Sequence, residues 1–246
     1  MCAPIRAAER AFRAGASGTR STPRYCRAAG AREEELPYNN IIAFDRHAAV
    51  LHYQVLDRKR PASVKSFLID AGAQHAGYAC DITRTYAAEP GEFLDLIRSL
   101  DTAQQKLVER VRPGTDYRDI HLEAHRAIAG VLVMHGIVSG SPESAVENGV
   151  TSVFFPHGIG HLLGIMVHDS AGFAAAPAGG TREKPAGHPY LAPDAGPRAG
   201  FRGHDRAGDL LHRLAARAGA RGRPRRCNRL EAGRGDPALG RDPDRG

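Results

Sequence analysis

The 246-residue chain has no tryptophan, only four cysteines and no long apolar run. The cysteines are scattered and form no C-x-x-C pair, so we expect neither a disulfide framework nor a structural zinc site, and a reducing cytosol is the default compartment. No segment approaches the roughly 18–20 apolar residues of a membrane span. The first ten residues also lack the apolar core of a secretory signal. These absences predict a cytoplasmic protein without a membrane partner.

Nearly all of the net charge of +7 lies near the C-terminus. Residues 192–246 contain 13 Arg, no Lys, six Asp and one Glu, which contribute +6. Arg, Ala, Gly and Pro make up 38 of these 55 residues, and Val, Ile, Met and Tyr are absent. Such a stretch cannot bury enough apolar surface to offset its conformational entropy. We therefore expect one domain over residues 1–191 and a disordered or poorly packed tail over 192–246.

Hydrophobic spacing predicts the elements of this domain. A helix is predicted over 1–16, a longer one over 93–111, and another that begins with Thr115 as its N-cap and ends near His135. Strands are predicted over 41–42, 49–51, 64–70 and 78–86, whereas 18–24 shows no pattern. The mixture of hairpins and long helices indicates an α+β fold.

Two carboxylates stand at the ends of neighbouring strands. Asp70 ends a buried strand, and Asp81 lies in the next one after a short turn. Two buried carboxylates repel each other unless one is protonated or a cation lies between them. A pair of divalent metal ions, roughly 3.5–4 Å apart, is the usual solution. A lone Asp is more often a turn cap or a salt-bridge partner, here of Arg84, so the prediction depends on the pair and on the histidines below.

Four histidines are candidates to complete this site. His157 and His161 have the i, i+4 spacing of a zinc-binding helix, but Gly158 and Gly160 each disfavour a helix by about 1 kcal/mol. No Glu follows the first His, as the helical zinc motif requires. An extended, glycine-rich segment fits better. His52 and His168 are further candidates, although any single one could be an ordinary core residue.

Several segments, in order, resemble the pita-bread metallopeptidases: Leu68–Gly72, Asp81–Thr85, Pro156–His161 and Val167–Asp169. The segments Pro37–Ile42 and Ala49–Tyr53 resemble its Xaa-Pro dipeptidase (prolidase) branch. The likeness runs from about residue 6 to 191 with one gap. It implies an α+β pita-bread catalytic domain that hydrolyses Xaa-Pro dipeptides with two divalent metal ions, Mn²⁺ first among them.

The resemblance also implies a role for each candidate. Asp70 would bind one metal ion, Asp81 would bridge both, and His161 would bind the second. The substrate and the tetrahedral intermediate would be held by His52, His157 and His168. The family implies a homodimer and an amino-terminal domain that this chain is expected to lack, which puts the dimer in doubt.

The chain departs from the family at two metal ligands. The family carries one Glu in an Ile-Glu-Pro-Gly segment and another in an Arg-Ile-Glu segment, but the glutamates beyond Phe173 are only Glu183 and Glu231, in other surroundings. Back-translation of 203–209, read one base later, permits Val-Thr-Ile-Glu-Pro-Gly-Ile. The same shift at 240–246 permits Gly-Ile-Arg-Ile-Glu. We infer a frameshift near Leu191–Ala192, and the unpatterned 18–24 could be a second, compensated one.

The loss of two carboxylates predicts a weakened site. Two divalent ions carry +4, and Asp70 with Asp81 supply only −2, so we expect at most one weakly bound ion and little or no peptidase activity. An aminopeptidase P-type exopeptidase and a non-catalytic pita-bread binding module remain as alternatives. A nucleic-acid binder is a third, but the tail has no Lys, one aromatic residue (Phe201) and no known recognition module, so no specific nucleic-acid partner is expected.

Overall fold

The computed structural model describes residues 2–169, 174–176, 179–181, 183–189, 191 and 203–205. Helices and 3-10 turns are α1 (Cys2–Arg13), α2 (Gly18–Ala29), η1 (Glu33–Glu35), η2 (Asp45–Ala49), α3 (Glu92–Arg110), α4 (Tyr117–Met134), α5 (Pro142–Glu147) and α6 (Val150–Phe154). Strands are β1 (Ile41–Phe44), β2 (Ser66–Ala71), β3 (Gln74–His75), β4 (Tyr78–Ala79), β5 (Ile82–Ala87), β6 (Gly160–Leu162), β7 (Ala174–Ala176), β8 (Gly179–Thr181) and β9 (Gly203–Asp205). The predicted mixture of helices and hairpins is confirmed.

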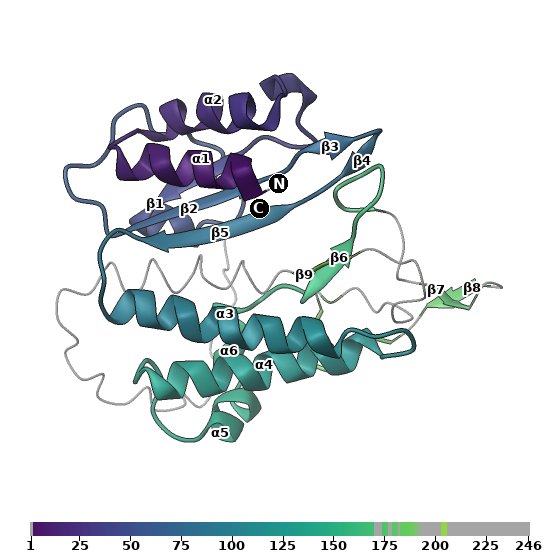
Figure 1. The fold of residues 1–246 in the computed structure, drawn as a ribbon. Helices are drawn as coiled ribbons and strands as arrows, with labels where there is room; N and C mark the ends of the chain where they lie inside the picture. Colours follow the sequence, from purple (N-terminus) through teal and green to yellow (C-terminus); the bar gives the residue numbers. More distant parts are fainter. Residues whose placement is uncertain are drawn as a thin grey trace, which may run out of the picture.

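An antiparallel sheet in the order β1-β2-β5 lies between two helical layers, with α1 and α2 on one face and α3 and α4 on the other (Figure 1). Alternate residues of its strands point to opposite faces. Ile42 and Ile69 join the apolar cluster of α1 and α2. Ile41 and Leu68 face the other way and pack near Phe93 of α3. Both faces of the sheet are therefore buried.

The N-terminal helix is amphipathic in the predicted way. The residues of its apolar face are at most 4% exposed: Ile5, Ala8, Ala11 and Phe12. The Phe12 ring stacks on Phe67 of β2 with 4.7 Å between ring centroids. Offset stacks of this kind add to the free energy gained from burial alone.

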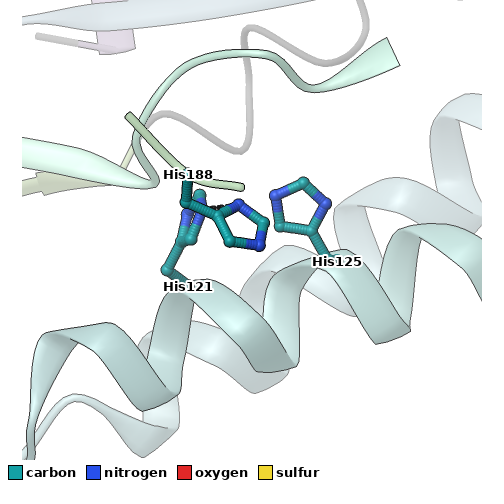
Figure 2. Close-up of side chains that lie close together, drawn as sticks. All are labelled: His121, His125 and His188. Atoms are coloured by element: carbon teal, nitrogen blue, oxygen red, sulfur yellow. Dashed lines mark hydrogen bonds between the residues drawn. The ribbon is translucent and has the colours of Figure 1, made fainter. Parts of the chain in front are cut away.

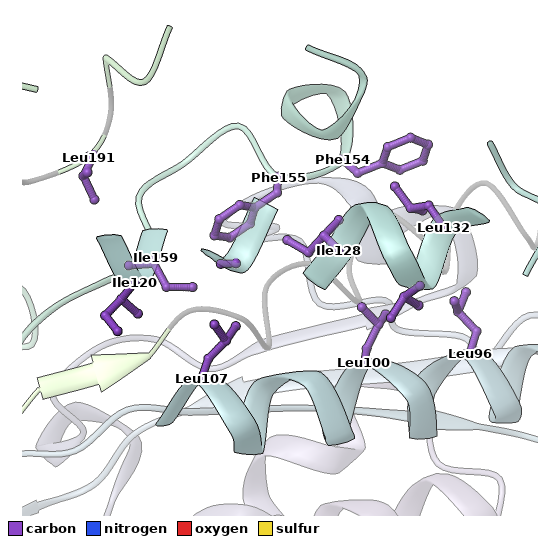
Figure 3. Close-up of a cluster of buried hydrophobic side chains, with 12 residues drawn as sticks. Leu96, Leu100, Leu107, Ile120, Ile128, Leu132, Phe154, Phe155, Ile159 and Leu191 are labelled. Atoms are coloured by element: carbon purple, nitrogen blue, oxygen red, sulfur yellow. The ribbon is translucent and has the colours of Figure 1, made fainter. Parts of the chain in front are cut away.

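A second apolar cluster holds α3 and α4 together (Figure 3). Leu96, Leu100 and Leu107 of α3 recur at helical spacing and face α4. The contacting side chains of α4 include Ile120, Ala124, Ile128 and Leu132, as the sequence predicts. The chain then passes through α5 and α6 to the glycine-rich segment at 157–161, which is extended rather than helical, as predicted.

The structure differs from the sequence-based expectations in several places, and the strand predicted over 78–86 is broken at 80–81 into β4 and β5. Residues 18–24, which show no pattern in the sequence, form the first part of α2, and a compensated frameshift there stays a prediction. The helix forms because its tertiary contacts outweigh weak propensity: Tyr25 is fully buried and its hydroxyl donates to the carbonyl oxygen of Gly72 at 2.9 Å. Residues 49–51 end η2 and enter a turn instead of a strand. The N-cap of α4 is Asp116, not Thr115.

Three residues of the predicted tail pair with the domain. Strand β9 lies antiparallel to β6, with His204 opposite His161 and Asp205 opposite Gly160. The remainder of 192–246 lies outside the described residues, so the prediction of a disordered tail is not addressed there. Within the described ranges, no helix has both the length and the apolar character to cross a membrane.

Candidate metal centre

The hairpin after β2 brings Asp70 and Asp81 to one end of the sheet. Asp70 pairs with Thr83 and Ala71 pairs with Ile82, so Asp81 enters β5 beside the end of β2. The intervening β3–β4 hairpin closes through a backbone hydrogen bond of 2.9 Å from Cys80 N to the Ala73 carbonyl oxygen. The sequence prediction that this turn brings the two carboxylates close together is thus realised in the fold.

The hydroxyl of Tyr38 lies between the two carboxylates. Its oxygen is 2.6 Å from Asp70 Oδ1 and 2.7 Å from Asp81 Oδ1. A phenol has one proton, so it satisfies only one of these oxygens at a time. Burial, and then the charges of Asp70 and Asp81, raise the pKa of Tyr38 far above its usual range, so the phenol stays protonated. Two converging carboxylates that share one proton form a strong acceptor site for a cation.

Close backbone packing keeps Tyr38 in this place. A Cβ on Gly72 would overlap the Cys80 carbonyl oxygen and the Tyr38 ring, and it would come within 2.8 Å of the Pro37 side chain. Only a glycine therefore lets the bend at 37–38 lie against the end of β2. The Tyr25 hydroxyl, which donates to the carbonyl oxygen of Gly72, fixes the same residue from the other side.

His161 reaches Asp81 from β6. Its Nε2 lies 3.4 Å from Asp81 Oδ2, and both side chains are only 10% exposed. The other ring nitrogen, Nδ1, lies 3.0 Å from the Leu162 carbonyl oxygen and must be the donor, because a carbonyl only accepts. In the neutral ring this leaves the lone pair on Nε2, the atom near Asp81. A proton or a metal ion on Nε2 makes the contact between His161 and Asp81 attractive. A hydrogen bond from Nδ1 to a backbone carbonyl oxygen is typical of a metal-binding histidine.

The loop after β6 folds back and brings His168 onto His161. The two rings stack with centroids 3.9 Å apart and an interplanar angle of 18°. Asp169 N donates to the Leu162 carbonyl oxygen at 3.2 Å, and Ala79 N donates to that of Gly164 at 2.9 Å. These bonds close the loop and fasten it to β4 beside Asp81.

The other two predicted histidines lie apart from this group in the described contacts. His157 is buried, stacks edge-on against Phe155 at 4.7 Å, and donates from Nδ1 to its neighbour Gly158. His52 is exposed in a turn with a φ of 55°. The structure therefore groups Asp70, Asp81, His161 and His168, and whether any of the six predicted residues binds metal or substrate remains a prediction.

The donors that the described contacts bring together are two carboxylates and one imidazole. Two carboxylates and one imidazole are ligand types that can hold a divalent ion. Of the glutamates beyond Phe173, Glu183 is exposed and Glu231 lies outside the described residues. Sequence reasoning did not identify Tyr38 as a site residue, although its position between Pro37 and two asparagines marked a turn. It also passed over His121, His125 and His188, which lie together elsewhere in the fold.

Comparison with known proteins identifies the family. The sequence pattern of metallopeptidase family M24 matches residues 6–188. Over 187 residues the chain is 56% identical to an Xaa-Pro dipeptidase of Stenotrophomonas maltophilia and 54% identical to one of Xanthomonas euvesicatoria pv. vesicatoria. Each match covers 76% of this chain and 42% of the relative, so the chain spans less than half the length of these relatives.

Solved structures agree on the fold. Aminopeptidase PepP of Pseudomonas aeruginosa superposes with a TM-score of 0.62 at 25% identity, covering 74% of this chain and 43% of that one. The low-pH form of Escherichia coli aminopeptidase P gives a TM-score of 0.60 at 22% identity, covering 87% of this chain and 57% of that one. The α+β pita-bread architecture expected from the sequence is confirmed, and the chain belongs to metallopeptidase family M24.

Proposed function

We propose that this chain is the catalytic part of an Xaa-Pro dipeptidase, and that in its present form it binds one divalent ion weakly and hydrolyses little or no dipeptide. The convergence of Asp70 and Asp81 on the single Tyr38 hydroxyl, with His161 beside Asp81, carries the proposal. The relatives of 53–56% identity named Xaa-Pro dipeptidase support the substrate class.

Asp70, Asp81 and His161 would hold the ions. In a complete site, divalent metal ions supply a hydroxide nucleophile and polarise the peptide carbonyl. Oxygen-rich ligand sets favour Mn²⁺ and similar ions. His168, stacked on His161, is exposed and would donate to a substrate oxygen, and His157 and His52, which precede this group in the chain, would also hold the substrate.

The frameshift accounts for the missing carboxylates. The family pattern ends at residue 188, shortly before the proposed shift at 191–192. Strand β9 lies beside His161, and the alternative frame permits Val-Thr-Ile-Glu for residues 203–206, so a glutamate would follow directly after this strand. The pairing of β9 with β6 thus supports a fourth ligand next to this strand in the alternative frame, although the residue encoded at 206 is Arg.

Two experiments test the proposal. Sequencing of the DNA across codons 185–246 decides the frameshift, because codons at 203–209 that cannot yield Val-Thr-Ile-Glu-Pro-Gly-Ile in the next frame would rule it out. The second compares the present chain with a frame-restored version in an Xaa-Pro dipeptide assay with Mn²⁺. We expect turnover and two bound ions only in the restored chain, and loss of turnover when Asp81→Asn is added to it. Equal turnover by the present and restored chains would refute the proposed loss of function.

Aminopeptidase P-type activity is the second candidate, because the solved structures that superpose are aminopeptidases P. Substrate length separates the two activities. A restored dipeptidase hydrolyses an Xaa-Pro dipeptide in preference to a longer peptide with Xaa-Pro at its start, and an aminopeptidase P shows the reverse. A restored chain that folds but cleaves neither substrate would favour the non-catalytic binding module.

A further inference from the structure

A second group of polar side chains comes from α4 and the segment 183–189. His121 and His125 stand four residues apart on one face of α4, and His188 meets them from the segment 183–189 (Figure 2). Each can offer one nitrogen such that all three lie within 4.8 Å of one another. Residues at i and i+4 are neighbours on a helix surface, the spacing with which two histidines bind one ion on a helix.

Two ring nitrogens in this group have no hydrogen-bond partner among the described residues. They are Nδ1 of His121 and Nε2 of His125, and each side chain belongs to a residue that is only 1% exposed. Buried polar atoms are nearly always paired with protein, water or an ion, so each such atom needs an explanation. Two of them in one cluster point to a ligand.

The hydrogen bonds that are present leave lone pairs toward the cluster. His125 Nδ1 lies 2.8 Å from Thr151 Oγ1, and a bond donated to that hydroxyl leaves the lone pair on Nε2. Histidines that bind metal ions usually donate from their second nitrogen in this way. His121 Nε2 and His188 Nδ1 are 2.9 Å apart, and when His121 donates the proton between them, its lone pair lies on the unpartnered Nδ1.

The three rings are neutral at physiological pH. Burial first, and then the neighbouring histidines, lower the pKa of His121 to about 3 and that of His125 to about 4. Burial also lowers the pKa of His188. Neutral imidazole is the form that binds a metal ion, so no proton has to be removed before binding.

We propose that His121, His125 and His188 form a binding site for a divalent transition-metal ion, with Zn²⁺ as its first candidate. A set of three imidazoles without a carboxylate selects zinc, copper or nickel over manganese or magnesium. Tetrahedral Zn–N bonds of about 2.1 Å place ligand nitrogens about 3.4 Å apart, so the rings must close by about 1.4 Å at most. The half-buried His188 leaves a fourth position for water.

The three ligands of this site are different residues from Asp70, Asp81 and His161 of the carboxylate centre. The Phe155 ring contacts both His121 and His125, with centroids 5.7 and 5.2 Å away, and it also contacts His157. Phe155 therefore lies against both the three histidines and the start of the glycine-rich segment, and His157 is near enough to contribute to the lowered pKa values of His121 and His125. A bound ion would fasten the segment 183–189 to α4, which is a structural role.

Zinc binding to the full chain tests the proposal. Asp81→Asn is introduced first to weaken the carboxylate centre, and bound Zn²⁺ is measured by equilibrium dialysis. We expect one ion per chain. Adding His188→Ala, in the segment outside α4, should lower the affinity at least about tenfold. Adding His75→Ala, an exposed histidine, should leave it unchanged.

X-ray absorption at the zinc edge keeps the test decisive if a variant fails to fold. In the chain that carries only Asp81→Asn, the coordination shell of bound Zn²⁺ should contain three imidazoles. An oxygen-dominated shell, loss of zinc in the Asp81→Asn chain, or equal affinities for the His188→Ala and His75→Ala chains would overturn the proposal and leave an adventitious ion only. The dipeptidase proposal rests on other residues and on peptide turnover, so the two can fail independently.

Discussion

At the candidate metal centre, Tyr38 has a single hydroxyl proton to donate to the two carboxylates of Asp70 and Asp81. One phenolic proton faces two carboxylate oxygens at 2.6 and 2.7 Å, so one contact is a charge-assisted hydrogen bond and the other depends on a shared proton or a cation. Removal of the hydroxyl leaves both carboxylates without this donor. Tyr38 therefore stabilises the chain when no metal ion is bound.

The Tyr38→Phe variant tests this role. With a chelator at pH 7, we expect its free energy of unfolding to fall by about 1–3 kcal/mol, because a buried acceptor loses its donor. Tyr53→Phe is the matched control, since the Tyr53 hydroxyl lies 3.3 Å from one carboxylate, that of Asp57, at a more open site. Urea denaturation followed by circular dichroism measures both. Equal losses in the two variants would contradict the special position of Tyr38.

Gly72→Ala tests the packing that positions Tyr38. The added methyl group meets the Cys80 carbonyl oxygen and the Tyr38 ring, so we expect a loss of roughly 1–3 kcal/mol and weaker Mn²⁺ binding. Gly130→Ala in α4 is the control, because its Cβ would have no heavy atom within 4 Å. A helical glycine-to-alanine change there should stabilise the chain by up to about 1 kcal/mol. Thermal unfolding and Mn²⁺ titration decide, and the same sign of change for both variants would speak against the overlap.

The sequence predicted part of the carboxylate centre at this scale. The strand-turn-strand pattern indicated that Asp70 and Asp81 would meet, and the predicted residues His161 and His168 lie beside them in the structure. Tyr38 was missed because it lies 32 residues from Asp70, in a bend whose path no local pattern reveals. Its position depends on close packing against Gly72, which only three-dimensional contacts show.

At the scale of the element, the start of α4 shows how a neighbouring residue can replace the expected cap. Asp116 Oδ1 accepts from Arg118 N at 2.9 Å, and the same carboxylate also pairs with the Arg118 guanidinium. Thr115, the predicted cap, lies one residue earlier, and its hydroxyl bonds to the Arg110 carbonyl oxygen at 3.3 Å. Both types of side chain are good caps, so the sequence alone could not choose between them.

Paired substitutions distinguish the two residues. Asp116→Ala should lower the free energy of unfolding by about 1 kcal/mol, because an N-terminal N–H of α4 loses its acceptor and a negative charge leaves the positive end of the helix dipole. Thr115→Ala should cost only a few tenths of that amount. Chemical denaturation of both variants at low and high salt measures the difference. A larger loss of unfolding free energy for Thr115→Ala than for Asp116→Ala would show that Thr115 is the N-cap of α4, as the sequence predicted.

The wrong element predictions share one physical cause. Residues 18–24 show no pattern in the sequence and include Pro23 inside α2, yet the helix is held by the burial of Tyr25 and Cys26 against the sheet. Residues 49–51 have strand-forming side chains but follow β1 at a place where the chain turns away. In both cases contacts distant in sequence outweigh local propensity, which sequence spacing does not report.

At the scale of the whole molecule, the apolar clusters on either side of the sheet explain why the fold class could be predicted. The residues of both clusters recur with periods of 2 in the strands and 3.6 in α3 and α4. The sequence pattern therefore predicts these strands and helices. The pairing of β9 with β6 was not predicted, because the composition of residues 192–246 suggested no strand. The three-histidine group was missed for another reason, since His188 lies 67 residues from His121.

That group also makes the stability of the whole chain depend on pH. The folded pKa values of His121 and His125, about 3 and about 4, lie below the value of about 6.5 expected when unfolded. The unfolded state therefore binds more protons between about pH 4 and 6.5, and the stabilisation present above pH 6.5 is lost as the pH falls. With a chelator present, we expect the free energy of unfolding to drop by about 1–2 kcal/mol per pH unit between pH 6.5 and 5.

Urea denaturation at a series of pH values measures this slope. His121→Gln should flatten it, because glutamine stays neutral throughout the range, although the variant is less stable at pH 7. His75→Gln, at an exposed position, should leave the slope unchanged. Carboxylates add to the slope mainly below about pH 5, so the window above it isolates the histidines. If the unfolding free energy of the unmodified chain did not change with pH, or if both variants had the same slope, the buried histidines would not be the cause of the loss of stability at acidic pH.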